Sequence, residues 1–252
     1  MGLPFWGAKD TQAAADGQLA PPGEWPQDGR MTTSPTGARA AATLLVQSLG
    51  EAGLESFRRR LEGPPSPSLD EEIRNCEQCS LCESRTQAVP GEGPIPADFM
   101  FIGEAPGADE DASGRPFIGK AGKLLTRIIE DGMKIPRREV YIANILKCRP
   151  PGNRDPLPEE TRACAPWLTA QIQKVQPKVI LALGRHAACH LLGKDSSLSS
   201  LRGRSHTDIP GLPPVVPTYH PAYLLRNPGA KKDCWEDIQL AMKVRDTKLD
   251  DS

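Results

Sequence analysis

The sequence predicts an α/β fold in which a mainly parallel β-sheet is covered by helices on both faces. Two observations support this prediction. Four short, strongly apolar segments indicate buried strands, and segments with helical spacing of apolar residues lie between them. Strands that alternate with helices along a chain are typical of a parallel sheet that is buried on both sides.

The predicted elements follow one another in a regular order after residue 97. Pro158 lies near the start of its helix, where a missing backbone N–H costs nothing. In a parallel sheet the ligand crevice lies beyond the carboxyl ends of the strands, so we expect the functional site in the loops that follow them. The predicted strands are 98–104, 139–146, 178–184 and 214–219, and the predicted helices are 120–130, 158–175, 185–192 and 232–244.

The first quarter of the chain differs in composition from the rest. Residues 1–38 hold 5 Pro and 6 Gly, and such a segment buries too little apolar surface to offset its ordering entropy, so we expect a disordered tail. Residues 39–67 combine helical leucine spacing with a Gly-Pro-Pro-Ser-Pro-Ser break, which indicates a helix followed by a Pro-rich linker. The compact domain is predicted over residues 68–247.

Charge and hydropathy narrow the class of protein. The formal net charge of −1 neither requires nor excludes a nucleic-acid partner, because a local basic face can bind phosphates. Residues 115–149 hold nine Lys and Arg against three Asp and Glu, which predicts such a face. The chain has no apolar run of membrane-spanning length and no pattern of a secretory signal, so we expect a bacterial-type cytoplasmic protein.

Five of the seven cysteines are spaced for metal or cluster binding. Cys76 and Cys79 form a C-x2-C pair that Cys82 extends, and Cys148 and Cys164 form a second pair with fifteen residues between them. Two such pairs can jointly hold one four-thiolate centre, of zinc or of iron and sulfur. The spacing alone does not decide between the two metals, nor whether Cys76 or Cys82 is the spare thiol.

The cysteines and the strand-end loops together resemble family 4 (type 4) uracil-DNA glycosylases, over residues 72–243. This resemblance implies a three-layer αβα sandwich with a central four-stranded, mainly parallel sheet. It also implies a monomeric DNA repair enzyme that flips uracil out of single- or double-stranded DNA and hydrolyses its N-glycosidic bond, leaving an abasic site. The matching segments are CEQC (76–79), RTQAVPGEG (85–93), GEAPGADEDASGRPFIGKAG (103–122), VYIANILKCRPPGNRDP (140–156), Cys164, LALGRHAA (181–188) and HPAYLLRNP (220–228).

The resemblance further implies a structural 4Fe–4S cluster. Its four ligands map onto Cys76, Cys79, Cys148 and Cys164, which leaves Cys82 as the spare thiol. The cluster would tie the segment before the first strand to the loop after the second strand.

The same resemblance implies which residues hold the base. His220 would stabilise the negative charge that develops on uracil O2. Asn144 would pair with O4 and N3–H, and cytosine presents the opposite pattern there. Phe117 would stack on the flipped base, and Glu110, near uracil C5, would exclude the methyl group of thymine.

Three further roles concern water and DNA. Ala105 stands among the substrate-binding residues, where the better-known family 1 enzymes have an aspartate that handles the attacking water, so Glu104 is the nearest candidate for that task. Leu224 and Arg226 are predicted to enter the DNA minor groove as a wedge. Alternatively, a capped helix turn would pack Leu224 inward.

Three other functions stay open on the sequence alone. A type 5 glycosylase would tolerate more bases, although the loop GEAPGADED favours type 4. Four thiolates also permit an iron–sulfur electron-transfer protein, or a metal-bearing nucleic-acid-binding module without catalysis. Cleavage of uracil-containing DNA separates an enzyme from both.

Overall fold

The computed structural model describes residues 68–250, with side chains to residue 247. The predictions of a disordered tail over 1–38 and of a helix and linker over 39–67 lie outside these residues. In the part that is described, no helix is long and apolar enough to cross a membrane.

The four predicted strands form one sheet, and all neighbours in it run parallel. Their order across the sheet is β2–β1–β3–β4, and the register places Gly103 of β1 opposite Asn144 of β2. The carboxyl ends of these two strands therefore meet side by side. The bounds are Phe99–Gly103 for β1, Tyr141–Asn144 for β2, Val179–Leu183 for β3 and Val215–Thr218 for β4.

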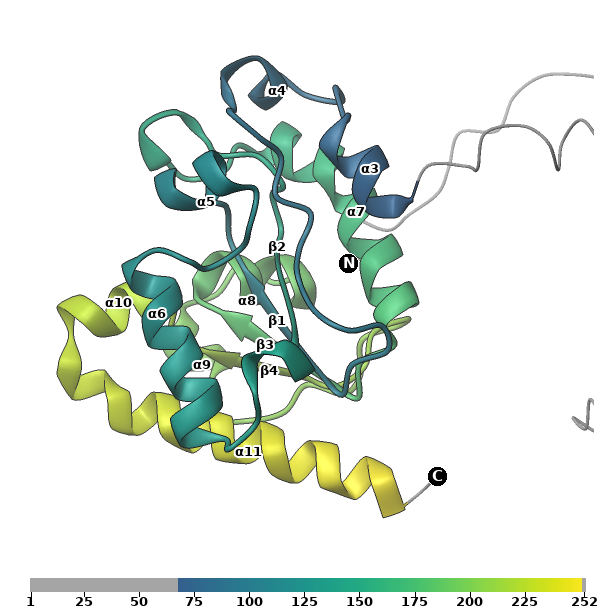
Figure 1. Ribbon diagram of the computed structural model, residues 1–252. Coiled ribbons are helices and arrows are strands. Elements are labelled where there is room, and N and C mark those ends of the chain that lie inside the picture. Colours follow the sequence, from purple (N-terminus) through teal and green to yellow (C-terminus); the bar gives the residue numbers. More distant parts are fainter. Residues whose placement is uncertain (1–67, 251–252) are drawn as a thin grey trace, which may run out of the picture. The chain divides into compact units, whose positions relative to one another are not determined.

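Helices cover both faces of the sheet, which confirms the three-layer αβα prediction (Figure 1). Side chains alternate along β1: Met100 and Ile102 pack in the core with α7 and α8, whereas Phe99 and Phe101 pack in the core with α6 and α11. These helices span Pro158–Val175 (α7), Arg185–Leu192 (α8), Lys120–Arg127 (α6, continued by the π-helical turn η1, Ile128–Gly132) and Lys231–Asp250 (α11).

Five short helices complete the fold. Four of them were not predicted, and the last, over Pro221–Arg226, is the capped helix turn that was the alternative to the wedge. They have only four to six residues each, too few for an apolar period to show. The first begins with a capping box, in which Ser68 accepts from the Glu71 N–H and the Glu71 carboxylate accepts from the Ser68 N–H. They are α3 (Leu69–Arg74), α4 (Leu81–Ser84), α5 (Ala108–Ser113), α9 (Leu198–Leu201) and α10 (Pro221–Arg226).

A third, smaller core lies apart from the two faces of the sheet. It joins Ile73 of α3 and Leu81 of α4 to Leu146, which follows β2, and to two cysteines. Figure 1 shows α3 and α4 at the end of the domain opposite α11. The segment before the first strand is thus packed against the loop after the second strand, as the cysteine pairs predicted.

One glycine allows α6 to pack against the turn that precedes it. A Cβ added at Gly122 would lie 1.8 Å from the backbone carbonyl oxygen of Phe117, so only hydrogen fits there. By contrast, a Cβ at Gly229 would meet no atom within 4 Å.

We expect Gly122→Ala to lower the free energy of unfolding by about 3 kcal/mol, because the methyl group forces α6 away from residue 117. Helix propensity alone would raise it by about 1 kcal/mol. Urea denaturation followed by circular dichroism measures the difference, with Gly229→Ala as the matched control. An unchanged or higher stability of Gly122→Ala would contradict the packing described.

Candidate functional site

A cavity of about 470 Å³ opens beyond the carboxyl ends of the strands. It lies where the topology of a parallel sheet places ligands. Tyr223 and Arg154 also line it, the former from α10 and the latter from the loop that follows β2. Seven of the residues predicted from the sequence line this cavity: Glu104, Ala105, Glu110, Phe117, Asn144, His220 and Arg226.

The absence of a side chain at Gly103 brings Asn144 and Phe117 together. A Cβ at Gly103 would lie 2.4 Å from Asn144 Oδ1 and 2.5 Å from Phe117 Cζ. Asn144 is only 1% exposed, and its Oδ1 has no hydrogen-bond partner among the described residues. A buried, unpaired amide oxygen costs about 1–3 kcal/mol, so this atom is suited to receive a donor from a bound ligand.

Phe117 reaches the cavity through an unusual backbone conformation. Its φ of 52° is left-handed, and its buried ring lies 5.6 Å from the imidazole of His220, tilted by 39°. Glu110 holds the turn in place, because its carboxylate accepts from the N–H groups of Ile118 (2.9 Å), Gly119 (3.0 Å) and Gly107 (3.1 Å). Glu110 therefore lines the cavity and also fixes the loop on which Phe117 stands.

His220 presents one hydrogen-bond donor to the cavity. It is the N-cap of α10, and its Nδ1 accepts from the Ala222 N–H at 3.2 Å. In the neutral ring the proton therefore resides on Nε2. Burial lowers the pKa of His220, so the neutral form is favoured at physiological pH.

A second histidine holds the carboxylate of Glu104. His186 Nδ1 lies 2.6 Å from Glu104 Oε2, and this hydrogen bond raises the pKa of His186. On the other side, His186 Nε2 lies 3.8 Å from Asp155 Oδ2. The sequence analysis quoted His186 within LALGRHAA but assigned it no role. Its position directly after the end of β3 was the available signal.

The structure places Leu224 differently from the predicted wedge. Leu224 is 1% exposed and packs in the core with α6 and α11, whereas Tyr223 and Leu225 beside it are 40% and 45% exposed. The alternative of a capped helix turn is the one observed. Its signals were Pro221 at the first helical position and a side chain at residue 220 able to cap.

The cysteines predicted to bind a cluster surround one small cavity. Three of them receive hydrogen bonds: Cys148 from Arg85 Nη1 (3.0 Å), Cys76 from Trp167 Nε1 (3.2 Å) and Cys164 from the Lys147 N–H (3.3 Å). Burial raises the pKa of the Cys164 thiol to about 11, so its thiolate needs a compensating positive centre. The cavity is lined by Cys76, Cys79, Cys82, Cys148 and Cys164.

Lys147 connects the two cavities and corrects one prediction. Its side chain is buried, and its Nζ donates to the backbone carbonyl of Asn144 and to Gln171 Oε1, both at 2.6 Å. Burial lowers its pKa to about 8. Lys147 therefore does not belong to the phosphate-binding face predicted over 115–149, and Arg137 is also largely buried.

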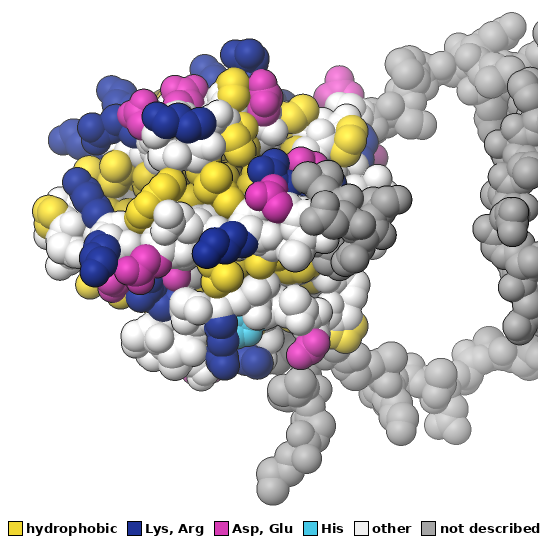
Figure 2. All heavy atoms as spheres, turned by 90° about the horizontal axis from the view of Figure 1, so that it is seen from below, with side chains coloured by type: hydrophobic (Ala, Val, Ile, Leu, Met, Phe, Trp, Pro, Cys, Tyr) yellow, Lys and Arg dark blue, Asp and Glu magenta, His cyan; other side chains and the backbone are white. Residues whose placement is uncertain are grey.

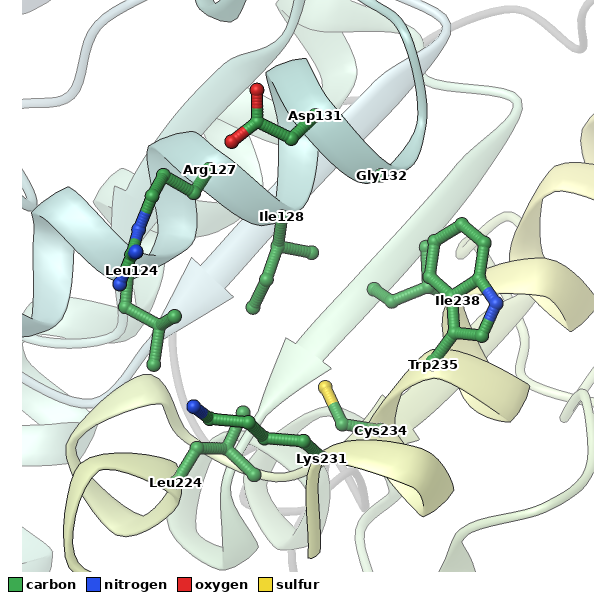
Figure 3. A pocket seen from close by; sticks show the side chains of 10 residues that line it. All are labelled: Leu124, Arg127, Ile128, Asp131, Gly132, Leu224, Lys231, Cys234, Trp235 and Ile238. Atoms are coloured by element: carbon green, nitrogen blue, oxygen red, sulfur yellow. The ribbon is translucent and has the colours of Figure 1, made fainter. Parts of the chain in front are cut away.

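A further cavity, of about 280 Å³, lies against α11. Figure 2 views this side of the molecule and shows hydrophobic side chains gathered there, with Lys and Arg around them. The close-up in Figure 3 shows Trp235 and Ile238 of α11 facing Ile128 and Leu124. None of the residues predicted to bind substrate lines it except the inward-facing Leu224, so this cavity is separate from the candidate site.

Known proteins are similar to this chain in sequence. Residues 90–239 match the model of the uracil DNA glycosylase superfamily. The chain is 46% identical to a type-4 uracil-DNA glycosylase of Saccharolobus solfataricus over 186 residues, which cover 71% of this chain and 86% of that protein. It is 44% identical to the type-4 enzyme of Thermotoga maritima (69% of this chain, 91% of that protein).

A type-5 relative is more distant. The type-5 uracil-DNA glycosylase of Thermus thermophilus is 34% identical over 149 residues, which cover 52% of this chain and 68% of that protein. The chain therefore belongs to the uracil DNA glycosylase superfamily and, within it, to the type-4 group.

Proposed function

We infer that this protein is a uracil-DNA glycosylase, which removes uracil from DNA by hydrolysing the N-glycosidic bond. The observation that carries this inference is a cavity in which a neutral His220, the ring of Phe117 and an Asn144 Oδ1 without a partner among the described residues meet. The type-4 relatives support the same activity. Action on single- and double-stranded DNA, as a monomer in the cytoplasm, is part of the proposal.

The amide of Asn144 accounts for the choice of base. Its Oδ1 is free to accept from N3–H of uracil, while its Nδ2 donates to O4. Cytosine offers an acceptor at N3 and a donor at C4, so it would leave buried polar groups unpaired, which a site of this kind rejects. The Phe117 ring supplies a face on which the extruded base stacks.

The imidazole of His220 would stabilise the leaving group. When the glycosidic bond breaks, uracil departs as an anion. A hydrogen bond donated to O2 is stronger when the base is the anion than when it is neutral. The neutral ring supplies this donor through Nε2–H, because Nδ1 is engaged by the Ala222 N–H. The carboxylate of Glu104, fixed by His186, lies beside the same cavity and would orient the attacking water.

We further propose that the cysteine cavity holds a 4Fe–4S cluster with Cys76, Cys79, Cys148 and Cys164 as ligands. Five cysteines around one cavity, three N–H donors to sulfur and the nearby cations Arg85 and Lys147 all suit a thiolate centre. When bound, the cluster supplies a structural cross-link between the start of the domain and the loop after β2. Cys82, which lines the same cavity, is proposed as the spare thiol.

We expect His220→Ala and Asn144→Ala each to lower kcat on a uracil-containing oligonucleotide by about 10²-fold or more, because each removes a donor to the departing base. Strand cleavage at abasic sites after alkali treatment, followed on gels, measures this. His206→Ala is the control, since the His206 ring hydrogen-bonds the Leu201 carbonyl and its backbone pairs with Val215 of β4, at the edge of the sheet and outside the lining of the cavity. Near-normal rates in both site variants would remove this assignment.

The pH profile tests the protonation state of His220. Its folded pKa is lowered by burial, so the neutral donor persists as the pH falls through 6.5, the ordinary histidine value. We expect kcat to be constant from pH 8 to pH 6.5 and to fall only at lower pH. The raised pKa of His186 is the competing source of an acid limb, so His186→Gln should keep the same limb. An acid limb centred above pH 7 in both proteins would be incompatible with a neutral His220.

The cluster has a readout independent of activity. We expect purified protein to be coloured and to contain iron and acid-labile sulfide, and Cys148→Ser or Cys164→Ser to lose both together with stability. Cys82→Ser should keep them. Stoichiometric zinc without visible absorbance would overturn the cluster, as would loss of iron from Cys82→Ser alone.

A further inference from the structure

We propose that the exposed ring of Tyr223 is a stacking surface for a DNA base, namely the neighbour that uracil leaves behind in the duplex. The proposal rests on the proposed glycosylase function and assigns to Tyr223 a contact that the sequence analysis sought at Leu224. It concerns the face of α10 that points away from the core.

The first observation is an unusual exposure of apolar side chains. Among the described residues, five large hydrophobic side chains are exposed, and two of them, Tyr223 at 40% and Leu225 at 45%, lie on the six-residue helix α10. Within the described part of the chain, this short helix buries Leu224 and presents two apolar surfaces, those of Tyr223 and Leu225, to solvent. Such surfaces beside a ligand cavity indicate a binding role.

The second observation is that the Tyr223 ring is held from behind. It stacks on Tyr219 with ring centres 5.1 Å apart and planes 12° from parallel. The Arg202 guanidinium lies 5.0 Å from the centre of the Tyr219 ring and is itself fixed by the buried carboxylate of Asp237 at 3.0 Å. A ring supported in this way loses little freedom when it binds, which favours stacking.

The third observation is the position of the ring relative to the cavity. Tyr223 lines the cavity that holds His220, and it stands only one helical turn from that residue. Tyr219 precedes His220 in the chain and Tyr223 follows it. The two stacked rings therefore connect the residues before and after the histidine. A base seated in the cavity leaves its former neighbour close to the Tyr223 ring.

The charges nearby favour nucleic acid over an apolar protein partner. Arg226 of α10 lines the same cavity, and its exposed side chain can meet a phosphate, whereas Arg154, which also lines the cavity, is paired with the buried carboxylate of Glu160. Aromatic rings interleaved with arginine are the usual means of holding unstacked bases, because every base has a π-face. Leu225 is also exposed, but it has no flat aromatic ring and lacks the support that Tyr219 gives to Tyr223.

The test compares Tyr223→Ala, Tyr223→Phe and Leu225→Ala on uracil in duplex and in single-stranded DNA. Binding is measured with an uncleavable 2′-fluoro-deoxyuridine oligonucleotide, and cleavage as KM and kcat. Trp235→Ala is the matched control, since Trp235 is also an exposed aromatic residue (37%) but lies on α11 at the separate cavity of Figure 3.

We expect Tyr223→Ala to weaken duplex binding and raise the duplex KM about tenfold or more, with a clearly smaller change on single strands, and Tyr223→Phe to restore both. Trp235→Ala should match the wild type. Equal losses of kcat on both substrates would mean that Tyr223 only positions His220, and a duplex-specific loss confined to Leu225→Ala would assign the contact there. Either result overturns the proposal.

The outcome for the wild-type protein separates this proposal from the function on which it rests. Wild-type cleavage of uracil together with an unaffected Tyr223→Ala overturns the stacking surface alone. A wild-type protein that leaves uracil in place on both substrates overturns both.

Discussion

A buried ammonium group holds the two halves of the site together. Lys147 Nζ donates to the Asn144 carbonyl and to Gln171, while the Lys147 backbone N–H donates to the Cys164 sulfur. An ammonium group out of water requires good acceptors, so the segment between Asn144 and Cys148 has little freedom to shift. The cysteine cavity and the Asn144 amide, the proposed reader of the base, are thereby fixed to one short stretch of chain, and a structural cluster would influence the pocket through this stretch.

Close backbone approach completes the pocket from the other side. Because Gly103 has no side chain, the Asn144 amide and the Phe117 ring can pack against it. Because Gly122 has none, α6 can pack against the Phe117 backbone. The left-handed φ of Phe117 is maintained by the three backbone N–H groups that Glu110 accepts. The polar and aromatic groups are consequently in place before a ligand arrives, as electrostatic preorganisation requires.

The sequence predicted best those strands and helices whose signals are local in the chain. All four strands and the bounds of α7 and α8 were predicted, because apolar runs and a proline at a helix start are local signals. The sequence left the direction of Leu224 open between a wedge and an inward-packed helix turn, because the face of a six-residue helix that is buried depends on where α6 and α11 lie. Similarly, Lys147 was counted among the surface cations. One acceptor of its ammonium group, Gln171, is distant in the sequence, so no local pattern could indicate that Lys147 is buried.

The site has to meet two electrostatic demands that conflict. In the proposed reaction a carboxylate near the sugar would favour the cationic character that develops there, yet Glu104 and Glu110 both raise the pKa of His220, whose neutral form is the proposed donor to the departing anion. Burial of the imidazole opposes them and is the larger effect. Both carboxylates are also engaged elsewhere, Glu104 by His186 and Glu110 by backbone N–H groups. These hydrogen bonds are compatible with a neutral His220, so His186, which holds Glu104, and His220 would serve the proposed reaction together.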